Sequence, residues 1–131
     1  MPAATGTFEV KHWNEAPYEE REDGAKLTRA EVEQSFSGGI AGEGVAQWLM
    51  AYRVDGTARF VGLQRVTGVI GDRKGAFVLE TIGDFDGAEA RWTATVIRGS
   101  GSGDLEDLSG SGSFRAPHGS TAEFQLEYDL G

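Results

Sequence analysis

Two ionisable residues share strand parity with large apolar side chains, and this placement would suit them to acid or base chemistry. Glu80 alternates in register with Val78, and His12 alternates in register with Val10. If these faces point into an apolar interior, loss of hydration raises the pKa of a carboxyl group and prepares it for general acid or base catalysis. We therefore take Glu80 and His12 as candidate catalytic residues.

Each candidate has an alternative interpretation. The other parity of the stretch AFVLETI, with Phe77 and Leu79, is equally able to face inward, and it would leave Glu80 as a surface carboxylate. His12 lies near a strand end, where the alternative is a solvated side chain. His118 falls in APHGS, a turn composition, so it is either a solvated loop histidine or a proton donor at a cavity mouth.

Seven further residues have the parity expected of an interior and could line a ligand pocket. They are Gln34, Trp48, Tyr52, Phe60, Gln64, Trp92 and Tyr128. Aromatic walls with a few polar groups are typical of small-molecule sites. The alternative is a filled core, because an eight-stranded barrel is just wide enough to be plugged by its own side chains or to hold one ligand.

The elements that position these residues are β-strands. Residues 27–36 (LTRAEVEQSF) and 120–130 (STAEFQLEYDL) alternate between polar and apolar side chains, which predicts half-buried strands. Asp-Gly pairs within residues 53–60 and 84–92 predict hairpin turns, and residues 69–80 supply a third reversal. About eight strands in mostly meander order would expose two sheet edges unless the sheet closes. We predict a single domain, residues 1–131, folded as an all-β, eight-stranded antiparallel barrel.

Residues 100–114 (SGSGDLEDLSGSGSF) could be mistaken for a phosphate loop or a linker. The stretch contains no lysine and has three carboxylates, so it does not fit a phosphate loop. Leu105, Leu108 and Phe114 are spaced to pack back onto the domain. We predict a barrel connection in which DLEDL forms one helical or irregular turn and SGSGSF leads into a strand.

Composition excludes several classes of function. The 131 residues carry 12 Lys and Arg against 21 Asp and Glu, a net charge of -9, and this balance opposes nucleic-acid binding. The chain has no cysteine, no secretory signal pattern and no long apolar run, which favours a cytoplasmic protein that acts without a membrane. Two distant histidines and the absence of a Gly-x-Ser-x-Gly elbow argue against a metal site, a cofactor and a serine hydrolase.

Several stretches carry a family resemblance that spans nearly the whole chain. GTFEVKHW, LTRAEVEQSFSGGIAGEG, QWLMAYR, RFVGLQRVTGVIGDRKGAFVLE and the glycine-rich stretch followed by EYDL resemble a bacterial domain-of-unknown-function family related in fold to allene oxide cyclase. The glycine-rich stretch is also similar to the Gly-x-Gly-x-aromatic turn of allene oxide cyclases and dirigent proteins. The resemblance implies an eight-stranded barrel with a central cavity, often dimeric or trimeric. It assigns no catalytic residue.

These observations lead to two function classes. The first is a cofactor-independent isomerase or cyclase acting on a small, largely apolar molecule in the barrel cavity, the style of work that the resemblance implies. The second is a non-catalytic carrier of such a molecule, and a structural or partner-binding barrel with a plugged core remains if no cavity exists. We also expect a homo-oligomer, foremost a homodimer, because such barrels associate and the chain has many aromatic residues for a tight interior.

Overall fold

The computed structural model describes residues 2–117 and 121–131, and this part of the chain is built from β-strands and turns without a helix. It therefore holds no helix long and apolar enough to cross a membrane. The nine strands are β1 (Ala3–Glu20), β2 (Lys26–Gly38), β3 (Ile40–Tyr52), β4 (Ala58–Ile70), β5 (Arg73–Phe85), β6 (Glu89–Val96), β7 (Ser102–Gly103), β8 (Ser109–Pro117) and β9 (Ala122–Asp129).

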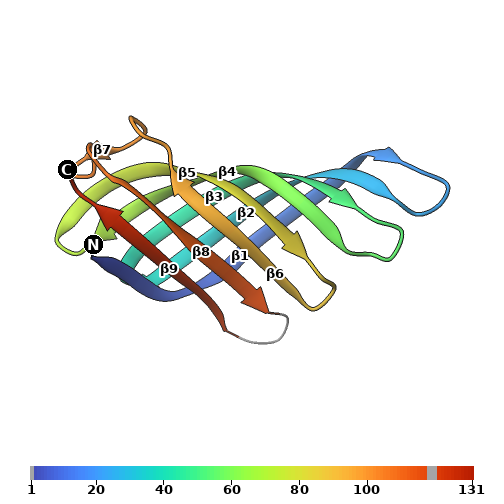
Figure 1. Ribbon diagram of the computed structural model, residues 1–131, viewed down its shortest axis with the longest axis horizontal. Helices are drawn as coiled ribbons and strands as arrows, with labels where there is room; N and C mark the ends of the chain where they lie inside the picture. The colour runs from blue at the N-terminus through green and yellow to red at the C-terminus, as the bar shows by residue number, and fades with distance from the viewer. Residues whose placement is uncertain (1, 118–120) are drawn as a thin grey trace.

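Eight of these strands close into an antiparallel barrel (Figure 1). The ring runs in meander order from β1 through β6, continues through β8 and β9, and returns to β1. The two-residue strand β7 pairs with β5 inside the connection between β6 and β8. Closure pairs the backbone groups that an open sheet would leave free. The predicted eight-stranded meander barrel is confirmed.

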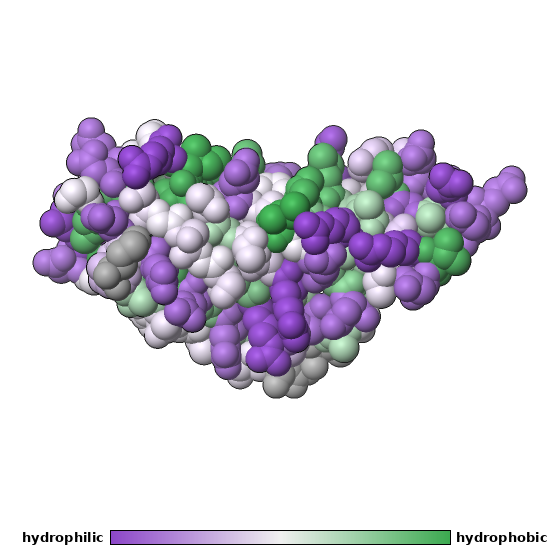
Figure 2. Space-filling view, viewed as in Figure 1, coloured by the Kyte–Doolittle hydropathy of each residue, from purple (hydrophilic) through white to green (hydrophobic). Residues whose placement is uncertain are grey.

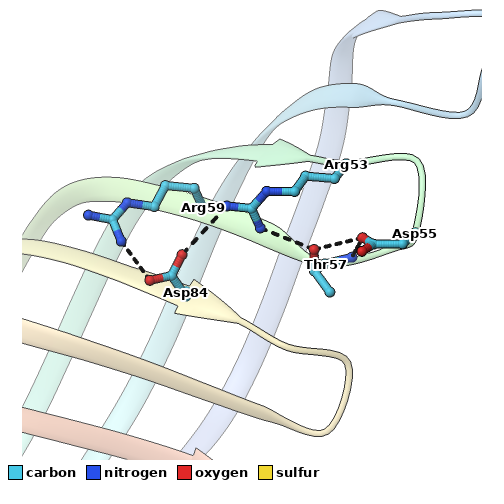
Figure 3. A network of polar contacts seen from close by, with 5 residues as sticks. All are labelled: Arg53, Asp55, Thr57, Arg59 and Asp84. Carbon is cyan, nitrogen blue, oxygen red and sulfur yellow. Dashed lines mark hydrogen bonds and ion pairs between the residues drawn. The ribbon is translucent and has the colours of Figure 1, made fainter.

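The alternating sequence pattern sets which side chains enter the barrel. On β2, Ala30, Val32 and Phe36 are buried, while Glu31 and Glu33 between them are exposed. The predicted Asp-Gly turns connect β3 to β4 and β5 to β6, with glycine in each at positive φ, 89° at the first. In the first turn the Asp55 carboxylate accepts hydrogen bonds from the backbone and hydroxyl of Thr57 (Figure 3).

Aromatic rings fill the middle of the barrel. The Trp92 and Phe114 rings stack with centroids 5.3 Å apart and planes only 4° from parallel. Trp48 meets Trp92 edge to face at 4.9 Å, and Phe8 contacts Phe36, Trp92 and Phe114. Such contacts add to the hydrophobic stabilisation of large buried rings. The middle of the barrel interior is therefore filled by side chains.

One end of the barrel is closed by the connection formed by residues 97–108, which lies beside the two chain ends in Figure 1. The backbone N–H of Asp104 donates to the carbonyl of Lys74 over 2.9 Å, which holds the connection against the start of β5. Leu105 is fully buried and Leu108 is 2% exposed, and both belong to the core cluster. The prediction that this glycine-rich stretch packs back and then enters a strand is confirmed.

The opposite end is open because β1 extends beyond its partner β9. Pairing between them stops at Phe8 and Ala122, while β1 continues along β2 to Glu20. In Figure 1 this β1–β2 hairpin projects beyond the others. Val10 and Trp13 face inward past the end of β9 and remain 45% and 43% exposed. The interior is therefore accessible beside them.

The outer surface is mainly polar. Figure 2 shows one face as predominantly hydrophilic, with hydrophobic side chains in separate groups. One outward-facing apolar row crosses three strands, since Leu49 lies opposite Val61 and Val61 lies opposite Ile82. All three are more than two-fifths exposed.

Candidate functional site

A pocket of about 300 Å³ lies at the open end of the barrel, the low end of the size range of small-molecule sites. One wall is formed by the part of β1 that extends beyond its pairing with β9, and another is formed by the end of β8. Its lining consists of Val10, Trp13, Gln34, Trp48, Met50, Tyr52, Phe60, Phe85, Ala88, Ala90, Trp92, Ala116 and Pro117. Most of these side chains are aliphatic or aromatic, so the pocket suits an apolar molecule.

Two tryptophans form the inner aromatic wall, and glycines on neighbouring strands make room for them. A Cβ at Gly62 would lie 2.7 Å from Cδ1 of Trp48, and one at Gly83 would lie 2.5 Å from Cβ of Trp92. Nε1 of Trp48 donates to the hydroxyl of Thr81 over 2.9 Å. This bond satisfies the polar edge of Trp48, so that its ring serves the pocket as an apolar surface.

A chain of three hydrogen-bonding side chains reaches the pocket from the barrel interior. Nε1 of Trp92 donates to Oε1 of Gln64 over 3.3 Å, and Nε2 of Gln64 donates to Oε1 of Gln34 over 2.7 Å. Gln64 is fully buried and Gln34 is 2% exposed. Nε2 of Gln34 has no hydrogen-bond partner within the described part of the chain. The pocket lining thus includes a buried amide with an unused donor.

An acidic side chain lies beside the pocket. The Glu15 carboxylate accepts hydrogen bonds from the Thr28 hydroxyl over 2.5 Å and from Nε1 of Trp13 over 2.9 Å. Burial, together with the neighbouring Glu15 carboxylate, raises the pKa of the Tyr52 phenol well above its ordinary value. Tyr52 is therefore neutral near pH 7. The two residues place a carboxylate and a phenol next to each other.

The outer side of the pocket rim is held by an ion-pair cluster. The Glu89 carboxylate accepts hydrogen bonds from the guanidinium groups of Arg91 and Arg115. These bonds, from Arg115 first and then Arg91, hold the pKa of Glu89 below its ordinary value. Glu89 lies opposite Pro117 in the β6–β8 pairing, and Pro117 lines the pocket. The cluster therefore ties together two strands that form the rim.

The structure brings five of the seven predicted ligand-binding residues to this pocket. Gln34, Trp48, Tyr52, Phe60 and Trp92 line it. Gln64 lies inside the barrel as expected but is not part of the lining, and it is hydrogen-bonded to two lining residues, Gln34 and Trp92. Tyr128 is not part of the lining: it pairs with Gly110 near the start of β8, on the closed side.

The prediction that Glu80 faces the cavity is wrong. Glu80 is exposed, while its neighbours Leu79 and Thr81 are buried, so the alternative parity of β5 is the one that enters the barrel. A carboxylate on the outer face is solvated and has no contact with the pocket. Its candidate catalytic role therefore loses its geometric basis.

The placement of His12 is also wrong, and a β-bulge explains it. An extra residue, Lys11, is inserted between the pairs Val10–Gln34 and His12–Glu33. The bulge turns His12 outward, where it is exposed, and gives the inward position to Trp13. His118 lies outside the described residues.

Sequence parity missed Glu15 and Trp13 for the same reason. Between this bulge and a second register shift after Pro17, the side chains of β1 change face, so Trp13 and Glu15 share the inward register of Val32 and Ala30. No local signal marks the bulge. In the described residues no three His, Asp or Glu side chains gather as metal ligands.

Comparison with known proteins assigns the family. The family described as "Protein of unknown function (DUF3224)" matches residues 4–128. The chain belongs to this family. A DUF3224 protein of unknown function from Shewanella oneidensis MR-1, solved by crystallography, is similar with 25% sequence identity and a TM-score of 0.84. The match covers 100% of this chain and 98% of that one. No curated protein matches the chain.

The DUF3224 assignment agrees with the expected unknown-function family and with the barrel. The Shewanella protein shares the fold over essentially the full length of both chains. Neither protein description names a ligand or a reaction.

Proposed function

We propose that this DUF3224 protein binds a small, largely apolar molecule in the open-end pocket and acts as a non-catalytic carrier. The observation that carries the proposal is the unfilled, apolar space beside Trp48 and Trp92 in a barrel whose other end is packed. Burial of apolar ligand surface against such walls provides binding free energy in proportion to the area covered. A carrier needs this shape and little else.

The polar groups favour a carrier over a catalyst. Among the described lining residues, Tyr52 is the one ionisable side chain; a phenol is already neutral near pH 7, and the raised pKa of Tyr52 takes it further from ionisation. A neutral phenol donates a hydrogen bond but does not remove a proton from carbon. The lining therefore supports binding more directly than acid–base chemistry.

A cofactor-independent isomerase or cyclase is the second candidate, and the Glu15–Tyr52 pair favours it. A carboxylate next to a neutral phenol supplies a general base and a general acid side by side. Kinship with allene oxide cyclases, which we propose from the glycine-rich stretch, would fit this chemistry. Glu15 itself is outside the lining, so the substrate would have to reach it past Trp13.

The carrier proposal is tested by titrating the protein with the neutral ketone 2-acetylnaphthalene in a calorimeter. We expect saturable binding that Ala90→Leu weakens by about tenfold, because the larger side chain enters the pocket. Thr95→Leu is the matched control, since Thr95 lies on the same strand and faces outward. Absence of binding, or equal binding by the Ala90 and Thr95 variants, would overturn the proposal.

The same ketone distinguishes carrier from catalyst. A catalytic Glu15 would take a proton from the methyl group of bound 2-acetylnaphthalene and return a deuteron from D₂O, which proton NMR follows as loss of the methyl signal. A carrier leaves the exchange at its background rate. Exchange that is accelerated in wild type and lost in Glu15→Gln, with binding retained, would favour the isomerase or cyclase.

The homodimer and the cytoplasmic location stay predictions. The phenylalanines offer little surface for association, because six of the seven are buried and the seventh, Phe85, is half-buried. The outward row of Leu49, Val61 and Ile82 is a better basis for contact between two copies. Light scattering that gives a monomer mass at high concentration would contradict the homodimer.

A further inference from the structure

We infer that the ligand is an uncharged molecule that presents a hydrogen-bond acceptor oxygen, as in a ketone, ester or ether, to Nε2 of Gln34. This inference rests on the proposed binding function and makes it more specific. It comes from the direction of the buried amide chain, from the charges around the pocket and from the size of the pocket.

The direction of the amide chain is fixed by Trp92. An indole Nε1–H can only donate, so Gln64 must turn its oxygen toward Trp92 and its NH₂ group toward Gln34. Gln34 must then offer its own oxygen to Gln64, which leaves its NH₂ group as the free end. Reversing either amide would set two donors or two acceptors against each other.

The free amide donor of Gln34 makes the pocket selective for ligands that can accept a hydrogen bond, because the donor destabilises the protein while it lacks a partner. A buried amide without a hydrogen bond destabilises the state that contains it, and a ligand oxygen that accepts the bond removes this penalty. Sites built around a buried polar group reject analogues that cannot satisfy it more strongly than purely apolar pockets do. Gln34 meets this condition because it lines the pocket and is 2% exposed. Its Nε2 has almost no solvent-accessible surface, so a small shift of the amide is needed to bring this donor to a ligand oxygen.

The charges near the pocket favour an uncharged acceptor. None of the thirteen described lining residues is Lys, Arg, His, Asp or Glu. The carboxylate of Glu15 lies next to two of them, Trp13 and Tyr52. An anionic ligand would lose hydration without gaining a cation and would meet this carboxylate, so its binding is opposed. A cationic ligand would leave the Gln34 donor unpaired.

The volume limits the size of the ligand. A space of about 300 Å³ corresponds to roughly ten water molecules in the liquid. One or two fused rings with a short substituent fit this space. The edges of Trp48 and Trp92 are occupied by hydrogen bonds to Thr81 and Gln64, so their apolar surfaces face such a ring.

The test compares two probes of the same shape. 2-Acetylnaphthalene carries a carbonyl oxygen where 2-isopropenylnaphthalene carries a CH₂ group. We measure the dissociation constants of both for wild type and for Gln34→Met, which keeps the side-chain length and removes the donor. The quantity of interest is the ratio of the two constants, because general damage to the pocket affects both probes.

We expect Gln34→Met to reduce the relative preference for the ketone by about 2- to 10-fold. Gln47→Met is the matched control: Gln47 is exposed on the outer face of β3, lies outside the lining and should leave the ratio unchanged. If Gln34→Met does not fold, Gln34→Glu replaces it. That variant keeps an acceptor for Gln64, and its ketone preference should fall as pH rises and the new carboxyl ionises.

An unchanged ratio in the Gln34 variants, with both probes still bound, would overturn the inference and leave the proposed function standing. Tighter binding of 2-naphthoate than of the ketone would overturn the claim that the ligand is uncharged. Failure of wild type to bind either naphthalene would instead overturn the proposed function, and the inference with it.

Discussion

The two ends of the barrel are built from the same strands but are finished differently. At the closed end, the long connection between β6 and β8 inserts Leu105 and Leu108 into the core. At the open end, short turns join the strands, and β1 extends past β9 without cover from it. The pocket therefore results from connection length and strand stagger rather than from a special strand sequence.

The interiors of the two ends also differ in polarity. Ile40, Ile70 and Leu126 are buried toward the closed end, where the core is aliphatic and aromatic. The buried amide of Gln34, the Tyr52 phenol and the Glu15 carboxylate all belong to the open end. Polar groups inside an apolar barrel destabilise it unless they are paired. The proposed ligand binding would account for their concentration at one end.

The largest expected effect is the loss of unfolding free energy when a buried side chain is truncated, and we compare this loss at the two ends. Leu105→Ala removes a fully buried side chain from the closed end and should lower the free energy of unfolding by about 2–5 kcal/mol. The loss of unfolding free energy for Met50→Ala at the pocket should be at or below the low end of that range, because the volume vacated by the side chain joins an existing space. Urea unfolding measures both. A larger loss for Met50→Ala would contradict this comparison.

Leu63→Ala is the matched surface control for Leu105→Ala. Leu63 faces outward on β4 and is 49% exposed, so its truncation should change the free energy of unfolding by no more than about 0.5 kcal/mol. A loss at Leu63 as large as that at Leu105 would show that Leu63 is covered in solution, as in an oligomer.

The same comparison shows what the sequence could predict. The barrel followed from period-two alternation and Asp-Gly turns, which are local signals, and the packing of Leu105 followed from its spacing in the glycine-rich stretch. Parity also identified Gln34 and Gln64 as inward-facing. The hydrogen bond between them joins residues 30 positions apart on strands that are not neighbours, so no local pattern reveals it.

The errors have two physical sources. On β5, both faces carry apolar side chains, since Val78 and Ile82 point outward while Leu79 points inward, so polarity could not fix the face of Glu80. On β1, the bulge at Lys11 changes the face of the residues from His12 to Pro17, which misplaced His12 and hid Glu15. A bulge depends on how β1 leaves β9 and follows β2, a property of the closed barrel.

A smaller effect concerns the acid stability of the open end. The pKa of Glu89 is lowered from 4.5 in the folded state, so its ion pairs stabilise the fold above that pH and lose this contribution as pH falls through the folded pKa. Glu89→Gln should lower stability near pH 7, and the difference from wild type should shrink as the pH falls below 4.5 and through the folded pKa. Urea midpoints over this pH range measure the change.

Glu80→Gln is the matched control for Glu89→Gln. Glu80 is an exposed carboxylate on the outer face of the neighbouring strand, so the urea midpoint of Glu80→Gln should stay close to that of wild type at every pH in this range. A difference between wild type and Glu89→Gln that grows on acidification would contradict the assigned role of the arginine contacts.

The smallest effect concerns a surface ion pair that links β4 and β5 near the open end (Figure 3). Arg59 contacts the Asp84 carboxylate at 2.6 Å, and Arg53 approaches its other oxygen at 3.8 Å. All three side chains are about half exposed, so solvent and salt screen the attraction. A double-mutant cycle with Arg59→Gln and Asp84→Asn should give a coupling of about 0.2–1 kcal/mol that falls at high salt. A coupling of several kcal/mol that resists salt would mean that this rim is as firmly packed as the closed end.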